Sequence, residues 1–204
     1  MNFRAQPRGT LSLRQFLSCF RSTLPSLILL ACTLATGASA LAETPATGAQ
    51  APNFTLLTPT GQSVSLVSET NKGTTVLVLL RGFPGYQCPY CVRQVHDFVG
   101  HAPDLAAKHV HVLLVYPGPP ADLDRHAKEF LAKQSDLPAN IQLVIDPDYK
   151  MTNEYGLRWD APHETAYPST FILDRHGKIL FEKISHSHGD RTTAGEVLGQ
   201  IPTK

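Results

Sequence analysis

The sequence predicts an α/β fold with a mixed central β-sheet, helices on both of its faces, and an N-terminal β-hairpin extension. Three apolar runs, at residues 75–80, 110–116 and 141–145, are unbroken and rich in branched side chains, as expected of strands buried on both faces. Segments with helical periodicity separate these runs, and this alternation indicates parallel strand pairs. Two later strands, 169–174 and 178–184, are joined by a short turn and indicate an antiparallel edge.

The domain is predicted to begin with the hairpin extension. Residues 53–58 form its first strand, a turn containing Pro59 and Gly61 follows, and residues 63–66 alternate back as the second strand. Residues 69–73 are predicted to be a polar connection that leads into the first buried strand.

The first long helix is predicted to start at Cys88 and to carry Val95, Phe98 and Val99 on one apolar face. Pro103 cannot donate a backbone hydrogen bond, so it should kink the helix or restart it. The second buried strand follows and is ended by a segment rich in proline and glycine.

The second half of the domain continues the alternation. Residues 121–134 carry apolar side chains at helical spacing and are predicted to be a helix. After the third buried strand, residues 146–148 form a turn and cap for a short helix that ends at Gly156. A loop over 157–168 precedes the late hairpin, and a final helix is predicted over 191–200.

Residues 1–42 predict a secretory signal peptide. Four arginines and no acidic residue precede an apolar stretch over 24–34, and residues 40–42 fit a small-x-small cleavage site. We therefore expect an exported, periplasmic protein with a leader over 43–52 and one domain over 53–204.

Two alternatives to a cleaved signal peptide stay open. The apolar stretch could remain as a membrane anchor, although it is shorter than the ~20 residues that span a bilayer. Residues 29–32 also resemble a lipobox, so the protein could be a lipoprotein attached through Cys32. Contact with a membrane is expected only in a form that keeps such an anchor.

Removal of the signal peptide changes the charge and the cysteine content. Lys and Arg fall from 18 to 14 while Asp and Glu stay at 17, so the formal charge moves from +1 to −3. No basic patch remains to indicate a nucleic-acid partner. Cys19 and Cys32 are lost as well, which leaves Cys88 and Cys91 as the cysteines of the mature chain.

The Cys88-Pro89-Tyr90-Cys91 sequence is the centre of the predicted chemistry. Cys-x-x-Cys spacing lets two sulfurs close a disulfide within one helical turn, and the start of a helix lowers the pKa of the first cysteine. A zinc site would need further ligands at a recognisable spacing. The loop that the pair closes is too small to stabilise the fold much, so redox chemistry is the favoured interpretation.

Several segments together resemble the thioredoxin-like superfamily, specifically the redoxin branch that includes peroxiredoxins of the AhpC/TSA type. The resemblance covers residues 50–200. It depends on residues 51–56, on Arg81-Gly82 with the Cys88–Cys91 motif, on residues 144–148 with Tyr155-Gly156, and on residues 168–178. It implies a thioredoxin-like fold in which Pro168 is cis and faces the cysteine pair.

The resemblance leaves two registers open, that is, two alignments with known motifs that differ in which cysteine attacks. In peroxiredoxins a Pro-x-x-x-Thr/Ser-x-x-Cys motif ends on the cysteine that attacks peroxide, which would be Cys91 here, with Cys88 in the Thr/Ser position. In thioredoxin-type oxidoreductases the first cysteine, Cys88, attacks and Cys91 resolves the mixed disulfide. The family's active-site arginine is replaced by Pro168, so Arg81 and Arg191 are the candidates for stabilising a departing oxygen.

The remaining candidates are weaker. His186 and His188 could bind a metal but are predicted to be part of a polar strand end and turn. Asp160, His163 and Glu164 lie with Trp159 on the loop before Pro168, where an acid or a histidine could move protons during disulfide exchange.

The predicted function is an exported, peroxiredoxin-type enzyme that reduces peroxides through a dithiol/disulfide cycle, with Cys88, Cys91, Pro168 and Arg81 as site residues. The chemistry needs no cofactor and no metal, and its partners are a peroxide or a protein disulfide as substrate and an external dithiol protein as reductant. One alternative is a thioredoxin-like oxidoreductase acting on partner disulfides. A second is a non-catalytic metal-binding or chaperone-like module.

Overall fold

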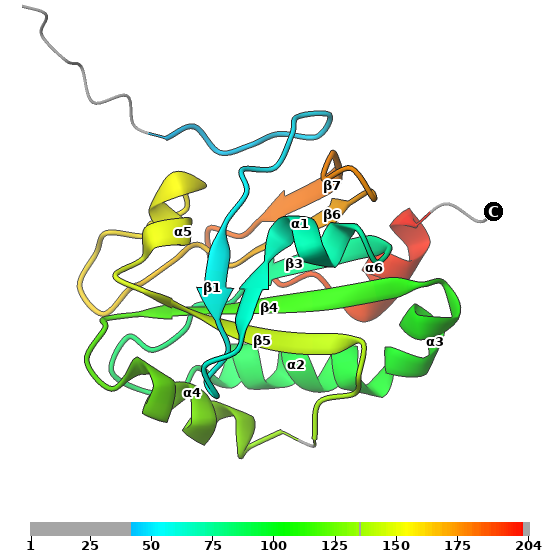
Figure 1. Ribbon diagram of the computed structural model, residues 1–204. Coiled ribbons are helices and arrows are strands. Elements are labelled where there is room, and N and C mark those ends of the chain that lie inside the picture. The colour runs from blue at the N-terminus through cyan, green and yellow to red at the C-terminus, as the bar shows by residue number, and fades with distance from the viewer. Residues whose placement is uncertain (1–41, 135, 202–204) are drawn as a thin grey trace, which may run out of the picture. The chain divides into compact units, whose positions relative to one another are not determined.

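A seven-stranded mixed sheet forms the centre of the computed structural model, which describes residues 42–134 and 136–201 (Figure 1). Its strand order is β2-β1-β5-β4-β3-β6-β7. The strands are β1 (Thr55–Leu57), β2 (Ser63–Ser65), β3 (Thr74–Leu79), β4 (Val110–Gly118), β5 (Ile141–Pro147), β6 (Ser169–Leu173) and β7 (Ile179–Ile184). The helices are α1 (Leu66–Thr70), α2 (Pro89–Gly100), α3 (Ala102–Ala107), α4 (Leu123–Leu131), α5 (Lys150–Glu154) and α6 (Ala194–Gln200).

The strand pairing confirms the predicted α/β class and its mixed sheet. The central strands β3, β4 and β5 pair in parallel, whereas β6 and β7 add an antiparallel edge. The predicted N-terminal hairpin is the antiparallel pair β1 and β2, which joins the other side of the sheet through β5. The site described below lies where β3 ends and α2 begins.

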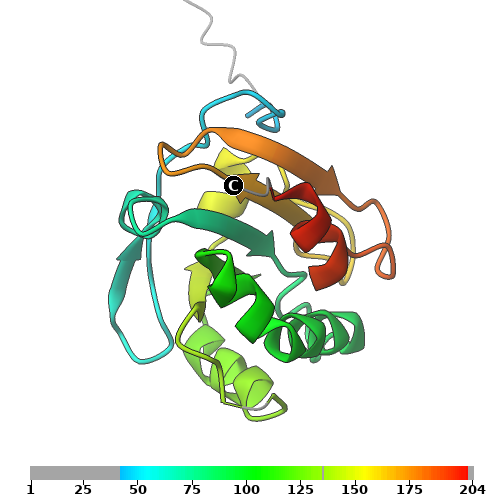
Figure 2. The same cartoon turned by 90° about the vertical axis from the view of Figure 1, so that its right-hand side faces the viewer.

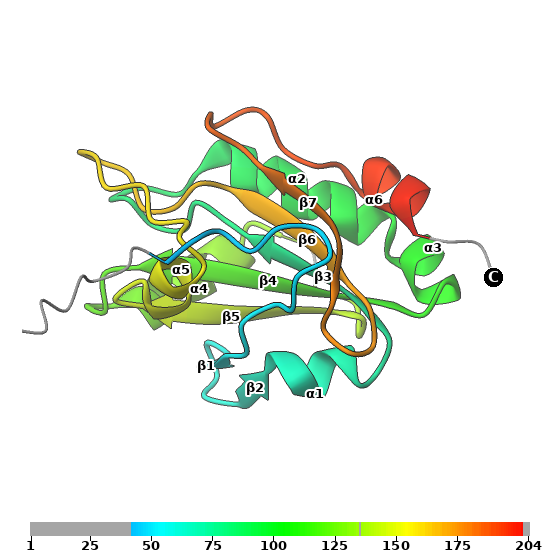
Figure 3. The same cartoon turned by 90° about the horizontal axis from the view of Figure 1, so that it is seen from above.

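Two apolar layers explain why β3 has no polar alternation. Val76, Val78 and Leu80 face the layer that α2, α3, α4 and α6 cover. Leu77 and Leu79 face the layer that α1 and α5 cover. Figures 2 and 3 show α2 and α6 on one side of the sheet and α1 on the other. A strand buried on both faces carries apolar side chains in succession, because alternating side chains point to opposite faces and both are buried.

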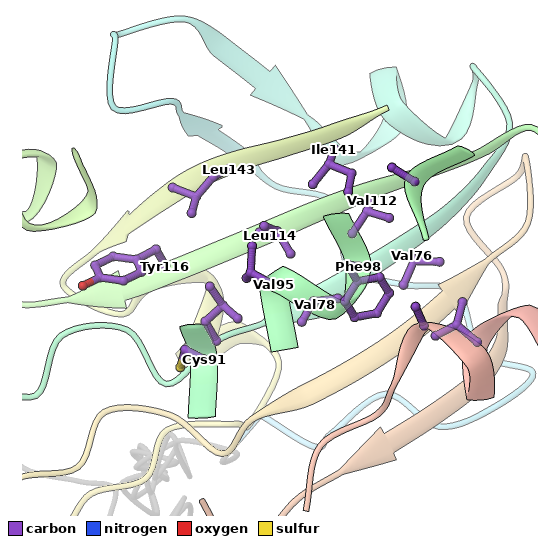
Figure 4. Packing of buried hydrophobic residues seen from close by; sticks show 14 of the residues in the cluster. Val76, Val78, Cys91, Val95, Phe98, Val112, Leu114, Tyr116, Ile141 and Leu143 are labelled. Atoms are coloured by element: carbon purple, nitrogen blue, oxygen red, sulfur yellow. The ribbon is translucent and has the colours of Figure 1, made fainter. Parts of the chain in front are cut away.

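Helix α2 is the longest helix among the described residues and packs along the centre of the first layer. Its apolar face carries Cys91, Val95 and Phe98, which contact the side chains of β3 and β4 (Figure 4). Cys88 is its N-cap residue in an extended conformation, and Pro89 occupies the first turn, where proline is tolerated. The predicted restart at Pro103 is confirmed, since α3 begins at Ala102.

Some predicted element boundaries are wrong. Residues 69–73 were predicted as a polar connection, but the first two of them belong to α1, which ends at Thr70. This helix starts with a capping box between Ser65 and Ser68. The helix predicted over 121–134 is the shorter α4. The final helix starts at Ala194 rather than 191, because a capping box between Thr193 and Glu196 ends the loop there.

The predicted leader, residues 43–52, packs against the domain. The Gly48 backbone N–H donates to the Ile179 carbonyl at 2.8 Å, and the Ile179 N–H donates to the Ala49 carbonyl at 2.9 Å. The signal-peptide prediction falls on residues outside the described part of the chain, apart from Ala42. Over the described ranges, none of the helices has the length and apolar character needed to cross a membrane.

The cis bond implied for Pro168 is wrong. All peptide bonds of the described residues are trans, the form that X–Pro bonds favour by about 0.5–1 kcal/mol. The trans bond lets the chain run extended into β6, and the Pro168 carbonyl accepts a hydrogen bond from the Ser185 N–H at 2.8 Å. Pairing of the chain beyond β7 therefore extends to Pro168, the residue just before β6.

Asp146 holds the turn between β5 and α5 from inside the protein. Its fully buried carboxylate accepts hydrogen bonds from the Met151 and Thr152 backbone N–H groups, both at 2.9 Å, and from the Thr152 hydroxyl at 2.7 Å. These donors satisfy the charge that burial would otherwise leave without a partner.

We predict that Asp146→Ala destabilises the protein by about 3 kcal/mol, because three hydrogen bonds to a buried charge are lost together. The free energy of unfolding in urea measures this. Asp160→Ala is the control, because the Asp160 side chain is 93% exposed. A loss for Asp146→Ala no larger than that of the control would contradict the assignment.

Candidate active site

The two cysteines lie at the junction of β3 and α2. Neither is part of a disulfide, and the exposed fractions of Cys88 and Cys91 are 1% and 0%. Cys88 caps α2, whereas Cys91 lies in its first turn and joins the apolar cluster beneath the helix (Figure 4). The predicted redox pair is therefore assembled at a helix start.

The loop that leads to Cys88 is held at both ends. Gly82 has φ +69°, and a Cβ at this position would collide with the Pro117 carbonyl, which accepts a hydrogen bond from the Phe83 N–H at 3.1 Å. Nearer the cysteines, the Tyr116 hydroxyl donates to the Gln87 side-chain oxygen at 2.9 Å. These bonds position the start of α2 against β4.

Cys88 is the thiolate of the pair. The hydrogen bond from the Cys91 thiol is the largest influence on it, burial opposes ionisation, and the Cys91 and Tyr90 backbone N–H groups and the Arg191 charge add to the first effect. Together they lower the pKa of Cys88 to about 5. The lowered pKa agrees with the prediction for a first cysteine at a helix start.

The pKa of Cys91 is shifted in the opposite direction. Complete burial raises the pKa of its thiol well above the usual range, and the neighbouring Cys88 thiolate adds to this. The Arg191 charge and the Arg81 backbone oppose the rise but do not cancel it. Cys91 therefore stays a protonated donor while Cys88 is ionised.

Arg191 lies across both sulfurs. One terminal guanidinium nitrogen is 3.6 Å from the Cys91 Sγ, and the other is 3.7 Å from the Cys88 Sγ. The side chain is held by the Gln94 amide oxygen at 3.3 Å and by the His188 carbonyl at 2.9 Å. A cation in this position compensates a thiolate that has lost its contact with water.

Arg81, predicted as the stronger arginine candidate, forms a different set of contacts. Its guanidinium is 1% exposed and pairs with the Glu164 carboxylate at 2.7 Å. It also donates to the Tyr86 hydroxyl at 2.7 Å and to the His163 carbonyl. These contacts use all of its nitrogens and fasten the 157–168 loop to the end of β3.

Glu164 connects Arg81 to the loop that carries Arg191. Its second carboxylate oxygen is 2.9 Å from the His188 Nε2. Burial opposes ionisation of Glu164, but Arg81 and His188 outweigh it and lower the pKa of the carboxyl. The chain of contacts runs from Arg81 through Glu164 to His188, whose carbonyl holds Arg191.

The other predicted candidates are divided between this network and the surface. Trp159 stacks on Tyr167, with ring centroids 4.9 Å apart, and its ring lies 5.3 Å from that of His188. His186 packs against Tyr167 instead of turning toward His188. Within residues 42–134 and 136–201, no group of three or more His, Cys, Asp or Glu side chains is arranged to hold a metal ion.

Gln94 was not among the candidates predicted from sequence, and Arg191 was considered only as the weaker arginine. Gln94 is buried at helical spacing from Tyr90 and Cys91, with its amide nitrogen donating to the Thr192 carbonyl at 3.1 Å. A glutamine three positions after a redox cysteine on an otherwise apolar helix face is the signal that could have identified it.

A comparison with protein families matches residues 47–181 to the AhpC/TSA family. Among curated proteins, none matches the chain. Solved structures show the fold. The peroxidoxin BcpB from Mycobacterium tuberculosis has a TM-score of 0.63 at 19% identity, covering 76% of this chain and 96% of its own.

Two further structures have the same fold. The yeast mitochondrial 1-Cys peroxiredoxin has a TM-score of 0.60 at 17% identity, covering 74% of this chain and 72% of its own. A protein named as a thiol:disulfide interchange protein, DsbE, from Chlorobium tepidum has a TM-score of 0.55 at 22% identity, covering 77% of this chain and 99% of its own. The thioredoxin-like fold implied by the sequence is confirmed.

We predict that Cys91→Ala and Arg191→Met both raise the pKa of Cys88 above about 5, because each removes a group that stabilises the thiolate. Titration of the ultraviolet thiolate absorbance of the reduced protein measures the pKa. Arg125→Met is the control, since that arginine is exposed and paired on α4. An unchanged pKa in Arg191→Met would show that the guanidinium does not support the thiolate.

Proposed function

The chain belongs to the AhpC/TSA family of thiol oxidoreductases, and from that premise we propose that it reduces peroxides, with Cys88 as the attacking thiolate and Cys91 as the resolving thiol. The observation that carries the proposal is a nearly fully buried thiolate covered by a guanidinium. A peroxide is small and therefore needs little room beside this buried sulfur. A protein disulfide would also have to bring its backbone against α2.

The first step forms a sulfenic acid. The Cys88 thiolate attacks one peroxide oxygen, the O–O bond breaks, and the second oxygen leaves as hydroxide or alkoxide and takes a proton. The Arg191 guanidinium contacts both sulfurs and is the charged donor that we propose to stabilise this developing negative charge. Arg81 is proposed to act indirectly, by holding the 157–168 loop and, through Glu164, the loop of Arg191.

The second step closes the disulfide. The Cys91 sulfur attacks the Cys88 sulfenic acid, and the sulfenic oxygen leaves as water after taking a proton. An external thiol reductant then restores the dithiol. This assignment uses the thioredoxin order of the two cysteines for a peroxidase reaction, because the ionised sulfur is Cys88 and the fully buried, protonated sulfur is Cys91.

A second candidate function is thiol–disulfide exchange. An ionised first cysteine beside a protonated, buried second cysteine is also the arrangement that attacks a disulfide and then resolves the mixed disulfide. The likeness to the protein named DsbE supports this candidate at the level of the fold. The two functions share Cys88 as nucleophile and differ in whether its target is oxygen or sulfur.

We further propose that the mature protein acts after export, in the periplasm, following removal of residues 1–42. The support is the sequence pattern of the N-terminus. An oxidising compartment would favour the disulfide form, so the cycle would need a dedicated supply of reducing equivalents.

We predict that Cys88→Ser abolishes peroxide consumption, whereas Cys91→Ser still consumes one equivalent and accumulates a sulfenic acid on Cys88. Mass spectrometry after trapping with dimedone locates the modified sulfur. Sulfenic acid formed on Cys91 in Cys88→Ser would contradict this assignment and support the peroxiredoxin register. A Cys91→Ser protein that traps mixed disulfides but ignores peroxide would favour the exchange function.

We predict that the rate constant for oxidation of the reduced wild type by hydrogen peroxide is half-maximal near pH 5, the pKa of Cys88, and flat above it. Only the thiolate attacks, so the rate falls as pH drops through this pKa. Stopped-flow measurements between acidic and alkaline pH test this. A rate that keeps rising toward 9.0, the ordinary cysteine pKa, would contradict it.

A further inference from the structure

A groove of about 180 Å³ lies between α2 and the segment that precedes α6. The helix lines it with Tyr90, Arg93, Gln94 and Asp97. The segment lines it with Gly189, Arg191, Thr192 and Thr193. Arg191 also contacts both sulfurs, so one lining residue of the groove touches the redox pair. Of these lining residues, the proposed peroxide step uses only Arg191.

The walls of the groove are preformed. The Arg93 guanidinium lies over the Tyr90 ring, 4.5 Å from its centroid. The other end of the ring packs on Gly189, where an added Cβ would be 3.2 Å from the ring. The buried Gln94 amide bridges Arg191 and the Thr192 carbonyl. The Tyr90 ring thus holds Arg93 in the wall of the groove.

The two guanidinium groups of the groove lack carboxylate partners. The contacts of Arg191 are sulfurs, an amide oxygen and a carbonyl, and the contact of Arg93 is an aromatic ring. In the described part of the chain, no carboxylate oxygen lies within 4 Å of either group. With two guanidinium groups and one carboxylate, that of Asp97, in its lining, the groove carries a net positive charge that an anionic ligand could neutralise.

One carboxylate, that of Asp97, lines the groove, and it is bound to other groups, as are the nearby carboxylates of Asp190 and Glu196. Asp97 accepts a hydrogen bond from the Ala194 N–H at 2.6 Å. Asp190 pairs with Lys183 at 2.9 Å, and Glu196 caps α6 through the Thr193 N–H at 2.6 Å. The ion-pair partners of these three carboxylates are His101 and Lys183, and not Arg93 or Arg191.

We propose that this groove binds the carboxylate of a low-molecular-weight thiol, which is the reductant of the Cys88–Cys91 disulfide. This inference depends on the proposed function, since it names the reductant of the same cycle. Arg93 and the outer edge of Arg191 bind the carboxylate and place the thiol sulfur at the disulfide. Recognition of a small molecule also suits sulfurs that are almost completely buried.

The reduction takes two equivalents of the thiol. The thiolate of the first attacks the Cys88 sulfur, the S–S bond breaks, and Cys91 leaves and takes a proton. A second thiolate attacks the ligand sulfur of the mixed disulfide, and Cys88 leaves as a stable thiolate. Two thiols are oxidised to one small disulfide, the protein disulfide is reduced, and one proton is released.

Two simple probes test the carboxylate requirement. The protein is first oxidised to the disulfide with diamide, and reduction by 3-mercaptopropionate is compared with reduction by 2-mercaptoethanol, each rate expressed per thiolate. Stopped-flow fluorescence of Trp159, the single tryptophan of the chain, follows the reaction. We expect the wild type to favour the carboxylate thiol, and Arg93→Glu to lower the ratio of the two rates by about fivefold.

Arg175→Glu is the matched control, because it changes the net charge equally from the β6–β7 turn, at the end of β6 away from Ser169. The control should keep the wild-type ratio. Equal rates with both thiols in the wild type, or an equal fall of the ratio in Arg93→Glu and Arg175→Glu, would overturn the inference.

The test separates this inference from the proposed function. Diamide forms the disulfide without peroxide, so a protein that ignores peroxide still reports on the groove. A protein that peroxide oxidises to the disulfide but that shows no preference for the carboxylate thiol would keep the proposed function and refute this inference.

Discussion

The contact of the Arg191 guanidinium with two buried sulfurs is the interaction on which the site depends. A thiolate removed from water is unstable unless hydrogen bonds and an opposite charge replace its hydration. The start of α2 supplies backbone donors, and Cys91 supplies a thiol donor, but neither brings a formal charge. Arg191 brings that charge from 100 residues away in the chain.

The rest of the domain can be understood as the support of that contact. The apolar side chains of β3 bury this strand between two layers and so fix its position. The chain leaves the end of β3 for the loop that leads to the cysteines. The pair of Arg81 and Glu164 fastens one loop to this strand, and the contact of Glu164 with His188 fastens the second loop, which carries Arg191. The carboxylate of Glu164 neutralises the buried Arg81 guanidinium and also contacts His188. The network therefore holds the Arg191 loop without leaving the Arg81 charge unpaired.

Much of this organisation could be predicted from sequence, for physical reasons that differ between residues. Strand β3 and helix α2 follow from local patterns, because burial on two faces demands an unbroken apolar run and a helix start has recognisable chemistry. The sequence left open whether Cys88 or Cys91 attacks. The choice depends on which sulfur is ionised, and ionisation depends on burial in the folded protein. The position of Arg191 depends on a loop returning over α2, and no local pattern encodes that return. The trans form of Pro168 and the five residues of α1 were missed because weak local preferences decide both.

The most direct test of the central claim, that Cys88 is a thiolate prepared to attack peroxide, is the second-order rate constant of the reduced wild type with hydrogen peroxide at neutral pH. Trp159 lies 5.3 Å from His188 in the loop network and provides a fluorescence signal for stopped-flow measurement. We predict a rate constant orders of magnitude above that of a free cysteine thiolate, with the Cys88–Cys91 disulfide as product. A rate constant equal to that of the free thiolate would show that the site does not assist O–O cleavage and would contradict the claim.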